Sequence, residues 1–312
     1  MKKTLIAAGF VALLGSTAMA QDIGVSMAKF DDNFLTVLRT GMSDYAATLS
    51  GVNLQVEDAG NDVAKQLDQI NNFIASGVKA IVVNPVDTSA TQAMSDAAAA
   101  ANIPLVYVNR QPVNVDTLPD NQAFVASNEV DSGTLETLEV CRLLKEAGKA
   151  DAQIYVMMGE LSNQAAVQRT ADIHDVMASG NCGVTLNIID EQTANWSRDE
   201  AQTLMTNWLS AGTAFDAVIA NNDEMALGAI NAMKAANMDM KTVIVGGVDA
   251  TADALAAMQA GDLDATVFQD AAGQGKGALD AALALAKGEA VEQKVYVPFV
   301  LVTPANVADF VK

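Results

Sequence analysis

The sequence predicts an α/β protein made of two doubly wound parallel-sheet lobes. Short apolar runs alternate with helical segments along the chain, which is typical of parallel sheets with right-handed crossovers and helices on both faces. The alternation then begins a second time. The two series meet near Ala123 without a long Gly/Ser linker, which favours a hinge over a flexible tether.

The first series contains five expected strands separated by helices. The strands are predicted at residues 23–28, 52–57, 80–83, 105–108 and 123–126. Helices are predicted at about 34–49 and 91–101. A third helix follows the second strand, where apolar side chains recur on one helical face at Leu67, Ile70, Phe73 and Ile74.

The second series begins with a helix at about 131–147. Its strands are predicted at residues 154–158, 185–189, 217–220, 242–245 and 265–268. A further helix at about 278–287, a strand at 295–301 and a C-terminal helix complete the predicted elements. Nearly every one of these strands ends in a cluster of polar residues.

The first twenty residues have the pattern of a secretory signal peptide. Lys2 and Lys3 precede an apolar run at residues 5–14, and Ala18-Met19-Ala20 supplies the small residues of a cleavage site. The apolar run is too short for a membrane span. We therefore expect cleavage after Ala20 and export of a protein that begins at Gln21. No cysteine stands at the site, so a lipoprotein anchor is not expected, and no later stretch resembles a membrane helix.

The composition indicates a large core and an acidic surface. The 312 residues are 51% hydrophobic and carry a formal net charge of −20. Removing Lys2 and Lys3 with the signal peptide leaves 16 basic against 38 acidic side chains, a net charge of −22. This balance argues against nucleic acid as a partner, because such binding needs clustered Lys and Arg.

Two cysteines, Cys141 and Cys182, fall in the second series. In an oxidising compartment a pair is bridged more often than free. A bridge would stabilise the fold by roughly 3–4 kcal/mol on the chain-entropy estimate, and two buried thiols are the alternative. With one histidine in the chain, we expect no metal site, and no cofactor is expected either.

Polar side chains at the expected strand ends are candidate ligand contacts, because the carboxyl ends of parallel strands open onto the ligand crevice. Most are amides and carboxylates, joined by two guanidinium groups and two aromatic rings: Asp32, Phe34, Asn84, Asn109, Arg110, Asn163, Arg169, Trp196, Asn222, Asp249 and Gln269. The set suits a neutral ligand rich in hydroxyl groups, since a hydroxyl can donate to a carboxylate and accept from an amide or guanidinium. Phe34 and Trp196 can cover the C–H faces of a ring, and core packing is the alternative for each.

One strand end shows how two roles compete for the same residues. The segment VIANNDEMALG (218–228) passes from an apolar strand through a polar cluster into a helix. An Asx side chain at such a point can contact a ligand or cap the following helix. We expect Asn222 to contact the ligand, and Asp223 and Glu224 to cap and start the helix.

Signals for an enzyme are poor by comparison. The single histidine, His174, lies in a helix between Asp172 and Asp175, which favours a surface position. The glycines at 273, 275 and 277 lie in a helical region, and no GxGxxG follows the first strand, so nucleotide binding is not expected. Asp32 and Asp249 would suit a glycosidase if they faced each other, but both also fit hydroxyl recognition, so this alternative ranks low. We expect no enzymatic activity.

Six segments together carry a specific resemblance to a known family. They are KFDDNFL (29–35), VNPVD (83–87), VNRQP (108–112), ANNDEMALGA (220–229), GGVDAT (246–251) and TVFQDA (266–271). The chain resembles the periplasmic sugar-binding proteins of ABC importers, in the group with the galactose/glucose-binding and ribose-binding proteins, over nearly its whole mature length.

The resemblance implies a type I periplasmic binding protein, with two lobes that are joined by a three-strand hinge and close on one sugar. It places the N-terminal lobe at 22–125 plus 269–295 and the C-terminal lobe at 126–268 plus 296–312. It also implies a monomer in the periplasm that delivers its ligand to an ABC permease in the inner membrane. All eleven candidate residues match contact positions of this family or lie beside them. Phe34 and Trp196 are expected to sandwich the ring, and Arg169 to donate two parallel hydrogen bonds.

Departures from the family pattern bear on the ligand. Galactose/glucose binders carry a His and an Asp where this chain has Asn163 and Ala165, and an acidic calcium loop where it has residues 147–151. The segments GELSNQAAVQRTADIHD (159–175) and EQTANWSR (191–198), with both cysteines, resemble the inositol- and rhizopine-binding subgroup. The ligand is therefore expected to be a cyclitol or monosaccharide, with myo-inositol or a related inositol ranked first. A pyranose or furanose such as galactose, glucose or ribose is the alternative. A sugar-processing enzyme of the envelope and a sugar-responsive repressor core rank lower.

Overall fold

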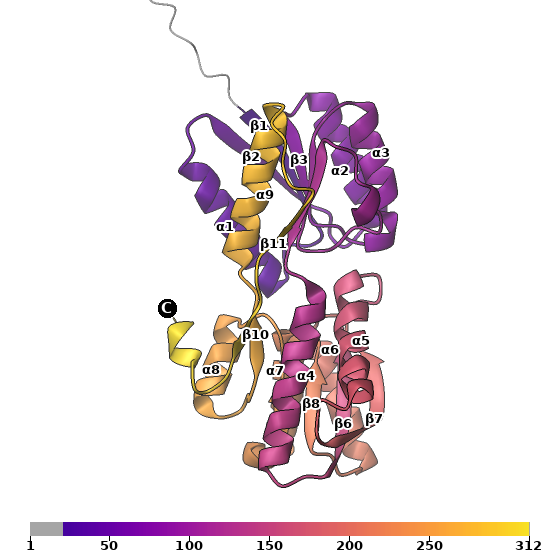
Figure 1. Ribbon diagram of the computed structural model, residues 1–312, viewed down its shortest axis with the longest axis vertical. Helices are drawn as coiled ribbons and strands as arrows, with labels where there is room; N and C mark the ends of the chain where they lie inside the picture. Colours follow the sequence, from indigo (N-terminus) through magenta and orange to yellow (C-terminus); the bar gives the residue numbers. More distant parts are fainter. Residues whose placement is uncertain (1–20, 312) are drawn as a thin grey trace, which may run out of the picture.

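The computed structural model describes residues 21–311, so the expected signal peptide lies outside the described residues. Two parallel sheets, each covered by helices on both faces, form two lobes stacked along the long axis of the molecule (Figure 1). We name them after their places in Figure 1: the upper lobe holds the six-stranded sheet, and the lower lobe the four-stranded sheet. The doubly wound α/β fold predicted from the sequence is confirmed.

The upper sheet is buried on both faces along its central strands. Its strands pair in parallel in the order β2 (Val52–Asp58), β1 (Gln21–Met27), β3 (Ala80–Val83), β4 (Leu105–Val108), β5 (Gln122–Ala126) and β11 (Lys294–Tyr296). Val82 and Val106 pack towards α1 (Asn33–Ala47) and α9 (Ala271–Ala286). Ile81 and Tyr107 pack on the opposite face against α2 (Val63–Ser76) and α3 (Thr91–Ala100). Because alternate side chains of β3 and β4 are buried on both sides, these two central strands read as continuous apolar runs.

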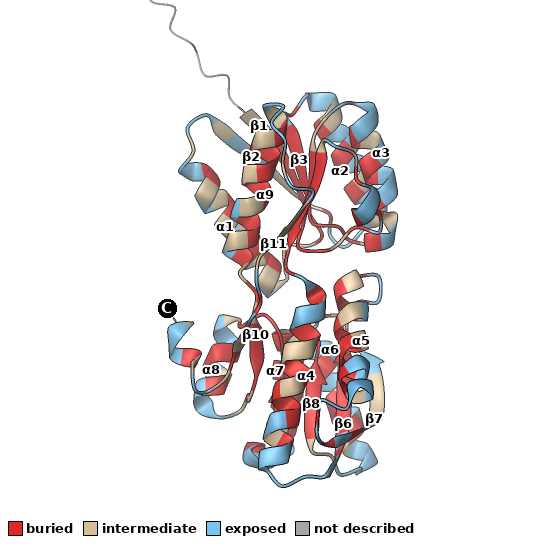
Figure 2. Ribbon diagram, viewed as in Figure 1, coloured by how far each residue is buried: buried red, intermediate tan, exposed pale blue. Residues whose placement is uncertain are grey.

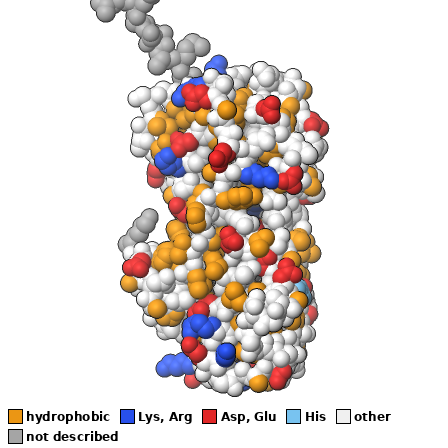
Figure 3. All heavy atoms as spheres, viewed as in Figure 1, with side chains coloured by type: hydrophobic (Ala, Val, Ile, Leu, Met, Phe, Trp, Pro, Cys, Tyr) orange, Lys and Arg blue, Asp and Glu red, His pale blue; other side chains and the backbone are white. Residues whose placement is uncertain are grey.

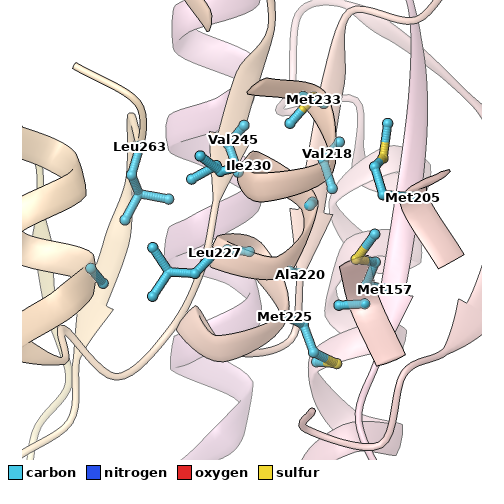
Figure 4. Packing of buried hydrophobic residues seen from close by; sticks show 14 of the residues in the cluster. Met157, Met205, Val218, Ala220, Met225, Leu227, Ile230, Met233, Val245 and Leu263 are labelled. Carbon is cyan, nitrogen blue, oxygen red and sulfur yellow. The ribbon is translucent and has the colours of Figure 1, made fainter. Parts of the chain in front are cut away.

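The lower sheet repeats this arrangement. Its parallel strands follow the order β7 (Thr185–Thr193), β6 (Asp151–Met158), β8 (Ala217–Ala220) and β9 (Ile244–Gly246). One face packs on α6 (Arg198–Ala211) and α7 (Asp223–Ala235) through a methionine-rich core shown in Figure 4. The other face packs on α4 (Glu129–Glu146) and α5 (Gln164–Ser179). Buried residues therefore run through both sheets and the facing sides of the helices (Figure 2).

The chain passes between the lobes three times: between β5 and α4, between β10 (Thr266–Phe268) and α9, and between β11 and β12 (Val300–Val302). β10 and β12 form an antiparallel pair beside α8 (Ala252–Ala260). Short 3-10 turns complete the elements at Thr88–Ala90, Val115–Thr117, Met240–Thr242 and Val307–Asp309.

Two predicted elements are wrong. The strand predicted at 295–301 is two strands, β11 and β12, because the chain leaves one sheet and joins another. Pro298 lies between them and has no N–H to donate to a sheet ladder. The predicted C-terminal helix is absent from the described part of the chain, where the turn Val307–Asp309 follows β12 instead.

Cys141 and Cys182 form a disulfide, as predicted, with Cα atoms 5.1 Å apart. The bond joins α4 to the segment that follows α5, within the lower lobe. Across residues 21–311, none of the helices is both long and apolar enough to cross a membrane.

Candidate functional site

A cavity lies between the two lobes at the carboxyl ends of their strands. The space between its walls is about 400 Å³, of which about 40 Å³ admits the centre of a water-sized sphere, so the walls lie close together. Ten of the eleven predicted residues line it together with three others: Asp32, Phe34, Leu35, Asn109, Arg110, Glu129, Asn163, Ala165, Arg169, Trp196, Asn222, Asp249 and Gln269. The structure thus brings together residues from both lobes and from a lobe crossing. Their role as ligand contacts stays a prediction.

The upper wall is held by local backbone structure. Asp32 caps α1, since its Oδ1 accepts a hydrogen bond from Leu35 N at 2.8 Å. Arg110 donates from Nη1 to the carbonyl of Pro85 at 3.0 Å and to that of Val86 at 3.4 Å. Burial lowers the pKa of Arg110, opposed by the nearby Glu160 carboxylate. The two carbonyls thus orient the guanidinium from within its own lobe.

A chain of amide side chains crosses from the upper to the lower lobe. Asn109 donates to Gln269 Oε1 at 2.8 Å, and Gln269 donates to Asp249 Oδ1 at 3.0 Å. Asn84 starts the chain by donating to Asn109 Oδ1 at 3.3 Å. Asn84 itself is fully buried and does not line the cavity, so it lies behind the site rather than in its wall.

Arg169 is the centre of the lower wall. Its Nε donates to Glu129 Oε2 at 2.7 Å, its Nη2 to Glu129 Oε1 at 3.2 Å, and its Nη1 to the carbonyl of Asn221 at 2.7 Å. A guanidinium has five N–H groups, so two remain for a ligand. Burial lowers the pKa of Arg169, but the carboxylates of Glu129 and Asp249 outweigh burial and raise it. The guanidinium is therefore held charged and oriented.

Sequence reasoning missed Glu129, because the helix was predicted to begin at 131. The signal was present nonetheless. Glu129 follows β5 by three residues and is a polar residue after a strand end, like the predicted contacts. Its carboxylate also accepts from Ser132 Oγ at 2.9 Å, so its oxygens are largely occupied by protein donors.

Trp196 takes its position from an unusual backbone and from a neighbouring glycine. Its φ is 62°, and a Cβ added at Gly159 would lie 2.2 Å from its Cζ2 atom. The Arg169 Cζ atom lies 5.7 Å from the centre of its ring. Within residues 21–311, the indole Nε1 has no hydrogen-bond partner although it is buried. The ring thus forms part of the cavity wall, with a donor still unused.

Asn222 and Asp223 correct the expected division of roles. Asn222 is itself the cap of α7, because its Oδ1 accepts from Met225 N at 3.0 Å, and it also lines the cavity. Asp223 is fully buried and accepts from Thr251 N and Thr266 Oγ1, both at 2.7 Å. Asp223 therefore ties α7 to the start of α8 and to β10 instead of capping the helix.

Two further polar groups of the cavity are deeply buried. Asn163 is 1% exposed, and its Oδ1 has no hydrogen-bond partner in the described part of the chain. Burial raises the pKa of Asp249 well above its ordinary value, opposed by Arg169. Buried polar atoms are nearly always hydrogen-bonded in native proteins, so a free acceptor in a cavity wall suits a ligand donor.

The donor set resembles neither a metal centre nor a nucleophilic site. The described residues contain no group of three or more His, Cys, Asp or Glu side chains that is placed to hold a metal ion. His174 is half exposed, pairs with Glu191 at 2.8 Å, and does not line the cavity. Amides, carboxylates and guanidinium groups around a narrow space can hold several hydroxyl groups at once.

Two lobes joined by three crossings around a polar cavity define the class as a two-lobed binding protein. A family model described as periplasmic binding protein domain matches residues 23–290, and the chain belongs to that family. A candidate rhizopine-binding protein from Rhizobium meliloti is 65% identical to this chain over 99% of each sequence.

Two solved structures agree with this assignment. A solute-binding protein of an ABC transporter from Bacillus halodurans C-125, with bound myo-inositol, matches with a TM-score of 0.87 at 40% identity, covering 95% of this chain and 99% of its own. The myo-inositol binding protein of Caulobacter, also bound to myo-inositol, matches with a TM-score of 0.84 at 29% identity, covering 95% and 97%.

Proposed function

We propose that this protein captures a cyclitol, myo-inositol or a related inositol, between its two lobes and delivers it to an ABC permease of the inner membrane. The observation that carries the proposal is the cavity itself, whose walls pair oriented donors with free acceptors in a space that suits one small ligand. The similarity to two proteins solved with myo-inositol supports this ligand class.

The chemistry of the walls supports a neutral polyol. A hydroxyl can donate to Asn163 Oδ1 or to a carboxyl oxygen of Asp249, and can accept from the two remaining N–H groups of Arg169. Myo-inositol offers six hydroxyl groups and no ring oxygen. Phe34 and Trp196, one on each lobe, are the proposed covers for its C–H faces.

The remaining expectations follow from this role. We propose that the signal peptide at residues 1–20 directs the protein to the periplasm. We also propose that the lobes move as units with the limits 22–125 plus 269–295 and 126–268 plus 296–312. A micromolar dissociation constant would need only about −8 kcal/mol of binding free energy, which a few charge-assisted hydrogen bonds and two stacked rings supply after closure.

A thermal-shift screen of sugars and polyols tests the ligand. A ligand at 100 times its dissociation constant adds about 2.7 kcal/mol to the free energy of unfolding, so the unfolding midpoint rises measurably. We expect myo-inositol to raise it, and galactose, glucose and ribose to raise it less. Stabilisation by galactose or ribose but not by any inositol would show that the proposed ligand is wrong. Recovery of unchanged inositol after incubation separates binding from turnover.

A further inference from the structure

Glu160 lies at the seam between the two lobes. It belongs to the lower lobe, two residues after β6, and it is 9% exposed. Its carboxylate meets side chains of the upper lobe, and its two oxygens have different partners. Sequence reasoning did not single it out.

The first oxygen, Oε1, is bonded at the outer rim of the cleft. Asn61 Nδ2 donates to it at 3.1 Å, and Lys29 Nζ lies 3.5 Å away. Both donors follow strand ends of the upper lobe. Asn61 is held in a left-handed conformation, with φ 59°, and its backbone N–H donates to the carbonyl of Ala28 at 2.7 Å.

The second oxygen, Oε2, has its partners in the wall of the ligand cavity. Asn163 Nδ2 donates to it at 3.3 Å, and Arg110 Nη2 lies 3.9 Å from it. Asn163 and Arg110 both line the cavity, one on each lobe. A single carboxylate therefore joins the rim of the cleft to the side chains that face a ligand.

Two other sets of contacts between the lobes lack a carboxylate that is paired with cations of the opposite lobe. Glu224 accepts from Asn33 of the upper lobe at 2.8 Å, but it is already paired with Arg198 of its own lobe at 2.8 and 2.9 Å. Thr88 meets Ser162 and Gln164 through uncharged groups. Within residues 21–311, both cations paired with Glu160 come from the opposite lobe. Opening the cleft would leave this carboxylate without them.

We propose that Glu160 is a positioning residue that couples closure of the lobes to the ligand cavity, and this rests on the proposed binding function. When the lobes close, Oε1 secures the rim through Asn61 and Lys29 while Oε2 holds Asn163 and Arg110 in place for the ligand. Buried charged contacts of this kind act mainly on the rate of dissociation, because they must break before the ligand leaves.

Two measurements test the role, with Glu160→Gln as the variant and Glu200→Gln as the matched control. Glu200 lies at the same outer opening, but among the described residues its carboxylate accepts only from Asn195 of its own lobe, at 2.8 Å. The first measurement is the stopped-flow dissociation rate of myo-inositol, followed by tryptophan fluorescence. The second is the distance between spin labels at Val113→Cys and Val167→Cys, with and without myo-inositol. Both positions are exposed on opposite lobes, and the native cysteines are bridged.

We expect E160Q to raise the dissociation rate about tenfold or more, with an association rate close to wild type, and E200Q to stay within about twofold of wild type. In E160Q, the distribution of distances between the two spin labels should also shift towards longer distances. The unfolding midpoint of E160Q without ligand should equal that of wild type. A merely structural role for Glu160 would lower this midpoint instead. Asn61→Gly removes one of the two contacts of Oε1 and leaves Lys29 in place, and its effect should not add fully to that of E160Q.

A wild-type dissociation rate together with wild-type label distances in E160Q would overturn the proposal. So would fully additive effects of N61G and E160Q on the dissociation rate. A wild-type protein that gives no signal with myo-inositol would overturn the proposed ligand alone, and the label distances would then decide the role of Glu160. If E160Q fails to fold, the dissociation rate and the label distances are measured on N61G instead.

Discussion

At the scale of the residue, several cavity side chains owe their direction to uncommon backbone conformations. Asn109, Trp196 and Asp249 have φ values of 67°, 62° and 124°. Positive φ costs a residue with a side chain about 1–3 kcal/mol and tends to occur at ligand sites, where the surrounding structure compensates. Each of the three follows a strand closely, so the turn at the strand end aims the side chain into the cavity.

Gly159 tests how strictly Trp196 must be placed. An added Cβ would lie 2.2 Å from the indole, so Gly159→Ala must displace the ring. We expect it to weaken binding of myo-inositol by about 1.5 kcal/mol or more, close to the effect of Trp196→Ala, through lost ring contact. Isothermal titration calorimetry measures this. The double variant should bind no more weakly than Trp196→Ala alone. Wild-type affinity in Gly159→Ala would show that the ring does not contact the ligand.

At the scale of the element, the packing of α4 against α5 supports the lower wall. A Cβ at Gly133 would lie 2.6 Å from the Arg169 carbonyl oxygen, so the glycine allows the two helices their close approach. The Glu129–Arg169 pair bridges the same two helices, and the Cys141–Cys182 bond ties α4 to the chain beyond α5. This helix pair therefore holds the guanidinium that faces the cavity.

Asp172 makes this packing sensitive to pH. Burial raises its pKa to about 7, opposed by the hydrogen bond from Gln168. The unfolded chain releases this proton near its ordinary pKa of about 4, whereas the folded protein keeps it until about pH 7. The contribution of Asp172 is thus fully present below about pH 4 and is lost as the pH rises to about 7.

We expect Asp172→Asn to flatten this decline, since the amide cannot ionise and still accepts from Gln168. Urea unfolding at about pH 5 and pH 7 gives the free energies to compare. Wild type should lose more stability than Asp172→Asn between the two. Asp44→Asn, at an exposed position of α1, serves as the control and should behave as wild type. An equal loss in wild type and Asp172→Asn would contradict the assignment.

At the scale of the whole molecule, acidity is the dominant surface property. The chain carries 38 acidic against 18 basic residues, and both signs are spread over the face shown in Figure 3 rather than gathered in one patch. Excess like charge destabilises the compact state by self-repulsion, and salt screens it. A neutral ligand held in a narrow cavity should feel little of this field.

We therefore expect added NaCl to raise the unfolding temperature while leaving the affinity for myo-inositol within about twofold between about 50 and 500 mM. Calorimetry at several salt concentrations provides both values. KCl serves as the control for a specific sodium effect. A steep fall in affinity with salt would indicate that the ligand carries charge.

The sequence predicted the strands more successfully than the path of the chain between them. Apolar runs located the central strands of both parallel sheets, such as β3, β4 and β8, because strands buried on both faces admit little else. The run at 295–301 failed, since its apolar pattern suits two sheets equally and only the spatial path of the chain decides where β11 ends and β12 begins. The C-terminal helix failed as well, where a single turn at Val307–Asp309 replaces it.

The sequence by itself determined the alternation of strands and helices, the cysteine pair and the polar side chains at the strand ends, because these depend on local pattern and composition. The tertiary structure decided which polar residues face the cavity. It placed Glu129 in the wall, set Asn84 behind it, and gave the helix cap to Asn222 rather than Asp223. The physical reason is that burial and hydrogen-bond partners are set by segments far apart in sequence that meet only in the folded chain.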